Sequence, residues 1–153
     1  MRYWLLKTEP QVFSFDDLIA APKRTTGWGG VRNYQARNLL RDALKKGDRA
    51  LIYHSNADPP HVAGEAEVVR EGYPDPTQFD PRDDHFDKGA PPDAPRWFQV
   101  DVRALRKLAR PVPLPLIRQT RALAKMALIQ RGQRLSVQPV SAAEYKAILA
   151  LAR

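Results

Sequence analysis

The segment 96–108 alternates between apolar and polar side chains. Successive side chains of a β-strand point to opposite faces of a sheet, so this pattern predicts a long strand with one face on a core. The core face carries Phe98, Val100, Val102 and Ala104, and the other face carries Trp97, Gln99, Asp101 and Arg103. A chain with such a strand has to build its fold around a sheet.

The other predicted elements are short. We expect strands at residues 3–7, 49–55, 64–70 and 135–139, and helices at residues 15–20, 33–45, 114–119 and 123–128. Ser14 with Asp17, and Ser141 with Glu144, have the spacing of a capping box, so the second pair predicts a last helix. Because the strands and helices lack regular βαβ spacing, we predict one α+β domain over 1–153, a mixed β-barrel with flanking short helices. A doubly wound parallel sheet is the alternative.

The net charge of +8 is unevenly distributed. Residues 103–134 hold nine Lys or Arg and no acid, whereas residues 71–93 hold seven acids. Six prolines between residues 72 and 95 predict a long loop there. A basic flank is typical of proteins that bind nucleic acids, although a solvated surface has the same composition. The residues that we expect to contact phosphates are Arg118, Arg121, Lys125, Arg131 and Arg134.

Several classes of protein are disfavoured. The chain has no cysteine, so it has neither disulfides nor a thiolate metal site. No apolar run approaches the roughly 20 residues that span a bilayer, and the first residues do not form a signal peptide. The Asp-rich segment 80–87 is typical of a solvated turn rather than a metal site. We expect a cytoplasmic monomer with no cofactor, no metal and no membrane partner.

The segment GWGGVRN, residues 27–33, has neither the spacing of a dinucleotide fingerprint nor that of a Walker loop. Its glycines instead clear side chains away from Trp28, which leaves an indole face for stacking on a flat partner. Arg32 and Asn33 supply donors and acceptors nearby. The alternative for Trp28 is a structural anchor in the core.

Two more segments carry polar or aromatic groups that can bind a ligand. In YHSN, residues 53–56, His54 and Ser55 point to opposite faces of a strand, so His54 cannot readily activate the Ser55 hydroxyl. These side chains are better suited to hydrogen bonding with a ligand. Trp97 lies on the polar face of its strand, where a large aromatic residue covers a second apolar cluster or lines a site.

Together these segments closely resemble the EVE domain, a branch of the PUA-like superfamily that includes bacterial single-domain proteins and the thymocyte nuclear protein family. The resemblance spans nearly the whole chain in the motifs YWLLKTEP, WGGVRNYQARN, GDRALIYHSN, YPDPTQFDP, PRWFQVDV and RLSVQPV. It implies a curved, PUA-like mixed β-barrel, a bacterial protein, and a pocket related to that of YTH domains. The residues that the resemblance places in this pocket are Trp28, Val31, Arg32, Asn33, His54, Ser55, Trp97, Ser136, Gln138 and Pro139.

The resulting prediction is a non-enzymatic domain that reads a modified nucleobase in DNA or RNA. One base would leave the stack and enter the pocket, at an unstacking cost of a few kcal/mol. Two alternatives stay open. The first is a small hydrolase acting on modified nucleosides, for which the chain offers His54, Lys7 and Glu9 but no matched pair. The second is a generic RNA-binding PUA-like module.

Overall fold

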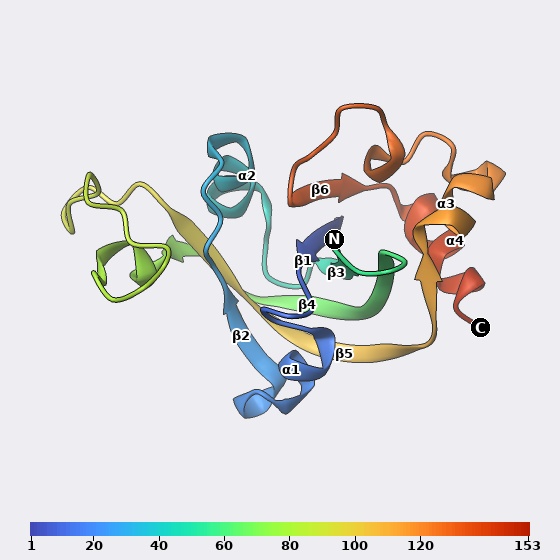
Figure 1. Ribbon diagram of the computed structural model, residues 1–153, viewed down its shortest axis with the longest axis horizontal. Coiled ribbons are helices and arrows are strands. Elements are labelled where there is room, and N and C mark those ends of the chain that lie inside the picture. The colour runs from blue at the N-terminus through green and yellow to red at the C-terminus, as the bar shows by residue number, and fades with distance from the viewer.

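A parallel pair of strands forms the centre of the fold (Figure 1). The computed structural model describes residues 1–153, and in it β1 (Tyr3–Thr8) pairs in parallel with β3 (Arg49–His54). All other pairs of the six-stranded sheet are antiparallel, in the order β2-β5-β4-β3-β1-β6. The bounds of the remaining strands are Thr25–Trp28 for β2, His61–Pro74 for β4, Phe98–Pro113 for β5 and Val137–Val140 for β6.

Irregular pairing makes the sheet curve. Along β4 and β5 the register shifts four times, between Val62 and Gly64, Glu65 and Ala66, Val68 and Arg70, and Arg70 and Tyr73. Shifts of this kind bend a strand and increase its twist, and both strands are visibly curved in Figure 1. The two end strands, β2 and β6, are not hydrogen-bonded to each other. The predicted PUA-like α+β class is confirmed, with a curved sheet whose end strands β2 and β6 do not pair to close a barrel.

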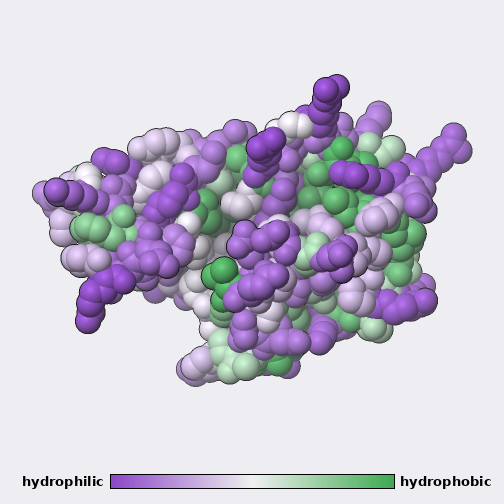
Figure 2. All heavy atoms as spheres, viewed as in Figure 1, coloured by the Kyte–Doolittle hydropathy of each residue, from purple (hydrophilic) through white to green (hydrophobic).

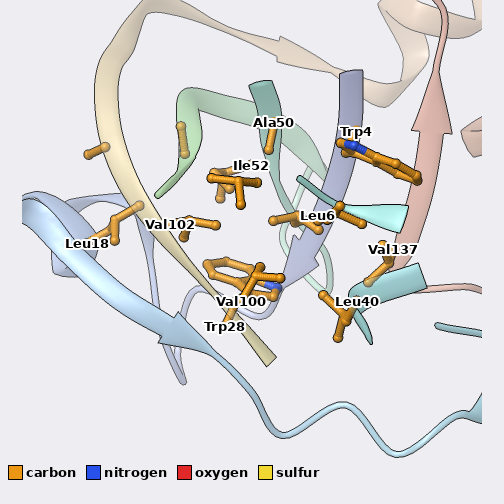
Figure 3. Packing of buried hydrophobic residues seen from close by; sticks show 14 of the residues in the cluster. Trp4, Leu6, Leu18, Trp28, Leu40, Ala50, Ile52, Val100, Val102 and Val137 are labelled. Carbon is orange, nitrogen blue, oxygen red and sulfur yellow. The ribbon is translucent and has the colours of Figure 1, made fainter. Parts of the chain in front are cut away.

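Apolar side chains cover both faces of the central strands. On β1, Trp4 and Leu6 belong to one buried cluster and Leu5 to the other, and Ile52 and Leu51 of β3 divide in the same way. The first cluster, seen in Figure 3, is covered by α1 (Phe15–Ala20), α2 (Tyr34–Asn38) and the π-helical turn η2 (Leu39–Ala43). The second is covered by α3 (Leu114–Gln119), the 3₁₀ turns η4 (Arg121–Leu123) and η5 (Ala127–Ile129), and α4 (Ala142–Leu151).

Local sequence signals explain where the helices begin. Both predicted capping boxes are present: Ser14 and Asp17 cap α1, and Ser141 and Glu144 cap α4. The Asn33 side chain accepts a hydrogen bond from the Ala36 N–H, 3.0 Å away, and so caps α2. Each cap satisfies backbone N–H groups that have no partner within the first turn.

The structure contains one strand that was not predicted and changes four of the predicted elements. β2 was not predicted, because four residues around a glycine show no alternation and only pairing with β5 makes them a strand. β4 extends beyond both ends of the predicted 64–70, and β5 begins two residues later than the predicted 96–108 but continues to Pro113, since the ends of the two strands pair with each other. The predicted helix 33–45 widens after Asn38, where the Leu44 N–H donates to the Leu39 carbonyl. The predicted helix 123–128 is replaced by the two turns η4 and η5, because Met126 between them has an extended backbone.

The surface is largely hydrophilic on the face shown in Figure 2, with apolar residues gathering on the side of α3 and α4. The lobe at the opposite end contains the 3₁₀ turn η3 (Pro76–Phe79) and the acidic loop after it. None of the helices has the length and apolar character needed to cross a lipid bilayer.

Candidate functional site

A cavity of about 680 Å³ lies between the segment 26–33, which includes the end of β2, and the carboxyl end of β1 with the residues after it. Small-molecule sites in proteins typically have volumes of about 300–1,000 Å³. The cavity is lined from the β2 end by residues 26–33, from the β1 end by residues 7–9, 12 and 13, and by residues 77, 85, 99 and 136. The segment 27–33 therefore forms one wall, as its glycines and tryptophan suggested.

The apolar part of the cavity consists of Val12, Phe13, Trp28 and Val31. Trp28 is 7% exposed and belongs to the first core cluster, where Figure 3 shows its ring beside Val100. The edge of the Phe13 ring meets it in a T-shaped arrangement with a centroid separation of 6.3 Å. The prediction that one face of the Trp28 indole is free for stacking is therefore wrong. Trp28 is a core residue that also lines the cavity. Val12, in contrast, is 73% exposed.

The glycine-rich wall is tied to the acidic loop by Asp75, which is fully buried. Its Oδ2 accepts hydrogen bonds from the Gly30 N–H at 2.7 Å and from Arg32 Nη1 at 3.1 Å, while its Oδ1 accepts from the Thr77 N–H and hydroxyl. Burial alone would raise the pKa of Asp75, but the hydrogen bonds from Thr77, Gly30 and Arg32 outweigh it and hold that pKa below its ordinary value. The carboxylate therefore fixes the position of this wall.

Arg32 fastens the same wall at a second point. Its Nε and Nη2 donate to the His85 carbonyl, and Nη2 also donates to the Thr77 hydroxyl. Thr77 and His85 line the cavity, yet sequence reasoning assigned no site residue to the loop 72–95. The loop's acidic, proline-rich composition indicated only a solvated turn. The contact between Asp75 and Arg32 brings this loop to the cavity. The two residues are far apart in the sequence, so the sequence did not predict that contact.

His54 lies outside the cavity, within a partly buried hydrogen-bond relay. Its Nε2 accepts from the Phe15 N–H at 3.0 Å, and its Nδ1 lies 3.1 Å from His61 Nε2. Since Nε2 is an acceptor, Nδ1 carries the proton and donates a hydrogen bond to His61 Nε2. Burial and the neighbouring His61 both lower the pKa of His54. The ring thus holds α1 against β3 and β4 rather than facing a ligand.

Trp97 also lies outside the cavity. The Tyr34 ring stacks on it with a centroid separation of 5.0 Å, and the Arg32 guanidinium lies over it at 5.3 Å. Its Nε1 donates to Asp87 Oδ2 at 2.6 Å, and the side chain is 6% exposed. Little of the ring is left to stack on a base, so the structure does not place Trp97 where the prediction needed it.

The remaining predicted site residues divide between the cavity and its surroundings. Val31, Arg32, Asn33 and Ser136 line the cavity, whereas Ser55, Gln138 and Pro139 do not. The Gln138 amide is buried and donates to the Leu135 carbonyl at 2.9 Å, and its Oε1 has no partner. The residues that sequence reasoning did not assign to the base pocket include Thr8, Val12, Phe13, Thr77, His85 and Gln99.

The five predicted phosphate contacts are all exposed and form no ion pair within the chain. Arg134 lines a second hollow of about 270 Å³, which shares Asn33 and Ser136 with the main cavity. Arg118 and Arg121 belong to α3 and η4, which cover the second core cluster on the other face of the sheet. Only Arg134 of the five lines a hollow that adjoins the candidate site.

The curved six-stranded sheet, its flanking short helices and the cavity between β2 and β1 define a PUA-like α+β domain. Within this class the chain belongs to the EVE domain family, whose sequence profile matches residues 2–151. It is 42% identical to human thymocyte nuclear protein 1 over 97% of this chain and 73% of that protein.

Three solved structures match the fold of this chain over nearly its whole length. The structure of human THYN1 protein in complex with 5-methylcytosine-containing DNA has a TM-score of 0.93 and 42% identity, covering 100% of this chain and 98% of that one. A hypothetical protein from Leishmania major has a TM-score of 0.93 and 46% identity, covering 99% and 94%. A protein from Pseudomonas syringae has a TM-score of 0.93 and 40% identity, covering 99% of each chain. Relatives come from eukaryotes and bacteria alike, so likeness to them does not identify the chain as bacterial.

The predicted cytoplasmic localisation is contradicted by the curated relatives, because those from human, chicken and mouse are nuclear proteins by name. The prediction rested on the lack of a signal peptide and of a membrane span. A nuclear protein lacks both as well, so these features do not separate the two compartments.

Proposed function

We propose that this protein is a non-enzymatic reader of DNA that carries 5-methylcytosine. The observation that supports this most strongly is the match, at a TM-score of 0.93 over the whole chain, to a relative in complex with 5-methylcytosine-containing DNA. The cavity supports it independently, since its volume suits one nucleobase and its lining combines an apolar wall with a few polar groups.

In the proposed mechanism one cytosine leaves the duplex stack and enters the cavity. Its ring and 5-methyl group pack against Val31, Phe13 and the accessible part of Trp28. A methyl group in an apolar pocket contributes about 1–3 kcal/mol, which offsets part of the few kcal/mol that extrusion costs. The methyl group thus decides whether extrusion is favourable.

The DNA backbone would follow the rim that the two hollows share. Asn33 and Ser136 line both hollows, and Arg134 lines the second one without a carboxylate partner. A phosphate next to the extruded nucleotide can therefore lie beside Arg134 while the base occupies the main cavity. This contact would raise affinity for every sequence equally.

The hydrolase alternative has less support. A hydrolase needs a general base within hydrogen-bond reach of its substrate. His54 is not among the residues that line the cavity, and its Nε2 already accepts the Phe15 N–H. Lys7 and Glu9 line the cavity but form no ion pair with each other, so no matched acid and base face a substrate there.

The experiment is a binding comparison by fluorescence anisotropy. Fluorescein-labelled duplexes of one sequence carry cytosine, 5-methylcytosine or 5-hydroxymethylcytosine at one central position, and RNA of the same sequence is measured beside them. We expect the 5-methylcytosine duplex to bind about 5-fold or more tightly than the cytosine duplex, in line with one buried methyl group. Equal affinity for the three duplexes would contradict the proposal and leave a generic nucleic-acid-binding module.

A further inference from the structure

A short relay of hydrogen bonds fixes the Gln99 side chain beside the cavity. Gln99 Nε2 lies 2.6 Å from the Tyr73 hydroxyl oxygen, and that hydroxyl lies 2.5 Å from Asp101 Oδ1. Tyr73 pairs with Gln99 across β4 and β5, so the relay is built into the sheet. Gln99 is 7% exposed and lines the cavity.

The relay determines which end of the Gln99 amide faces Tyr73. A carboxylate only accepts hydrogen bonds, so the Tyr73 hydroxyl donates its proton to Asp101. Burial raises the pKa of Tyr73 and the bond to Asp101 raises it further, so the hydroxyl keeps that proton at neutral pH. The Tyr73 oxygen then accepts a hydrogen bond, and only the NH₂ end of Gln99 can supply it. Gln99 Oε1 therefore points away from the Tyr73 hydroxyl, and the relay holds the amide in this orientation.

Gln99 Oε1 has no hydrogen-bond donor within the protein. The only buried side-chain nitrogen or oxygen atoms without a partner are Arg49 Nε and Gln138 Oε1, so Gln99 Oε1 keeps some accessible surface, and the residue lines the cavity. Glycines make this possible: a Cβ on Gly27 would overlap Gln99 Nε2, and a Cβ on Gly29 would overlap Gln99 Oε1. The two glycines thus let the main chain cross the amide closely without a side chain over it.

We infer that Gln99 Oε1 is the acceptor by which the cavity selects a base with an exocyclic amino group. The inference rests on the proposed function, in that a nucleobase occupies the cavity. Cytosine presents an N4 amino group, and 5-methylcytosine presents the same group beside its methyl. Thymine carries the same 5-methyl group but has a carbonyl oxygen at position 4, and that oxygen would face Gln99 Oε1 with no proton between them. Gln99 would therefore distinguish cytosines from thymine, while the apolar wall distinguishes methylated from plain cytosine.

The test compares bases that differ at one group. Labelled duplexes carry 5-methylcytosine, cytosine, thymine or uracil opposite an abasic site, so that base pairing does not differ between them. Affinities are measured by anisotropy for the parent protein, Gln99→Leu and Tyr73→Phe. The Leu variant removes the acceptor. The Phe variant removes one hydroxyl and frees the amide to rotate.

For the parent we expect 5-methylcytosine to bind about 10-fold or more tightly than thymine, the size of a well-placed base contact. Gln99→Leu should bring this ratio close to one by weakening 5-methylcytosine. Tyr73→Phe should lower the ratio by strengthening thymine, because the rotated amide presents its NH₂ to the carbonyl oxygen.

Three results overturn the inference: a parent that binds 5-methylcytosine and thymine equally, a folded Gln99→Leu that keeps the parent's ratio, or a Tyr73→Phe that keeps it. Circular dichroism and thermal melting confirm folding, and if Gln99→Leu does not fold, the result for Tyr73→Phe decides. The ratio of 5-methylcytosine to cytosine tests the proposed function separately. A parent that rejects thymine but binds both cytosines equally contradicts methyl reading and supports the role of Gln99.

Discussion

Asp75 and Gly30 are joined by a hydrogen bond of 2.7 Å from the Gly30 N–H to the Asp75 carboxylate, although 45 residues separate them. The bond attaches the glycine-rich wall of the cavity to the acidic loop after β4. Arg32 and Thr77 donate to the same carboxylate. The shape of the cavity therefore depends on one buried acid far from it in sequence.

Replacing this acid should weaken the fold and the cavity together. Asp75→Asn keeps one acceptor but loses the charge that attracts Arg32, and a hydrogen bond to a charged group contributes about 1.5–3 kcal/mol. We expect the free energy of unfolding, measured by urea titration, to fall by about that amount. Asp84→Asn is the matched control, because Asp84 lies exposed in the same loop. Equal effects of the two substitutions would mean that Asp75 does not anchor the wall.

The same acid should make the protein sensitive to low pH. The pKa of Asp75 is lowered in the folded state, so its contribution to stability is complete above the unfolded value of about 3.9 and is lost as the pH falls below it. Acid unfolding of the parent should therefore be steeper below about pH 4 than that of Asp75→Asn. Parallel stability curves for the two proteins in this range would contradict the assignment.

The lowered pKa of His54 predicts a second, smaller loss of stability as the pH falls. Its pKa is lowered by burial and by His61, so the unfolded chain binds the proton more readily than the folded one. Stability should be complete above the unfolded pKa of about 6.5 and decline as the pH falls below it. Melting temperatures of the parent and of His54→Gln, measured between pH 5 and pH 8, check this. A parent curve that is flat over this range would show that the relay through His54 is not linked to folding.

Trp28 should be required for folding as well as for binding. It is a buried core residue, so Trp28→Ala should lower the free energy of unfolding by about 3–5 kcal/mol. Val12→Ala, at an exposed position on the same cavity, should change it by less than about 0.5 kcal/mol. Chemical denaturation measures both. A Trp28→Ala protein as stable as the parent would show that the ring is not a core anchor.

Arg134 should carry more of the salt dependence of DNA binding than Arg121. Each phosphate contact on duplex DNA contributes about 0.9 to the slope of log affinity against log salt concentration. We expect Arg134→Ala to reduce that slope by about this amount, and Arg121→Ala to leave it unchanged, because η4 covers the other face of the sheet. Anisotropy titrations at four salt concentrations give the slopes. A larger effect of Arg121→Ala would place the DNA on that other face.

The elements that local sequence specifies could be predicted. Alternation identified β5, and the serine-initiated capping boxes identified α1 and α4. The motif 27–33 identified one wall of the cavity. These features depend on neighbouring residues, whose chemistry is visible in the sequence itself.

The rest depends on long-range contacts. Alternation placed Trp97 and Gln99 on one face of a strand, but Trp97 lies just before β5, where Tyr34 covers it, and Gln99 in β5 lines the cavity. His85 lines the cavity, where its carbonyl accepts a hydrogen bond from Arg32, which also donates to Asp75. Neither outcome follows from periodicity, which assigns a side chain to a face but does not say what packs on that face.

The central claim, that a methylated cytosine occupies the cavity beside Trp28, is tested most directly by indole NMR. The chain has three tryptophans, and each gives one indole ¹⁵N–¹H signal. Only Trp28 lines the cavity, whereas the Nε1 of Trp4 is bonded to Asp48 and that of Trp97 to Asp87. The signal that is missing from the spectrum of Trp97→Phe belongs to Trp97. Spectra of variants substituted at Trp4 or at Trp28 assign the other two signals.

Titration with the 5-methylcytosine duplex should shift the Trp28 signal and leave the Trp4 signal in place, and the cytosine duplex at the same concentration should shift Trp28 less. A Trp28 signal that does not move while the DNA is bound, or that moves equally with both duplexes, would contradict the account.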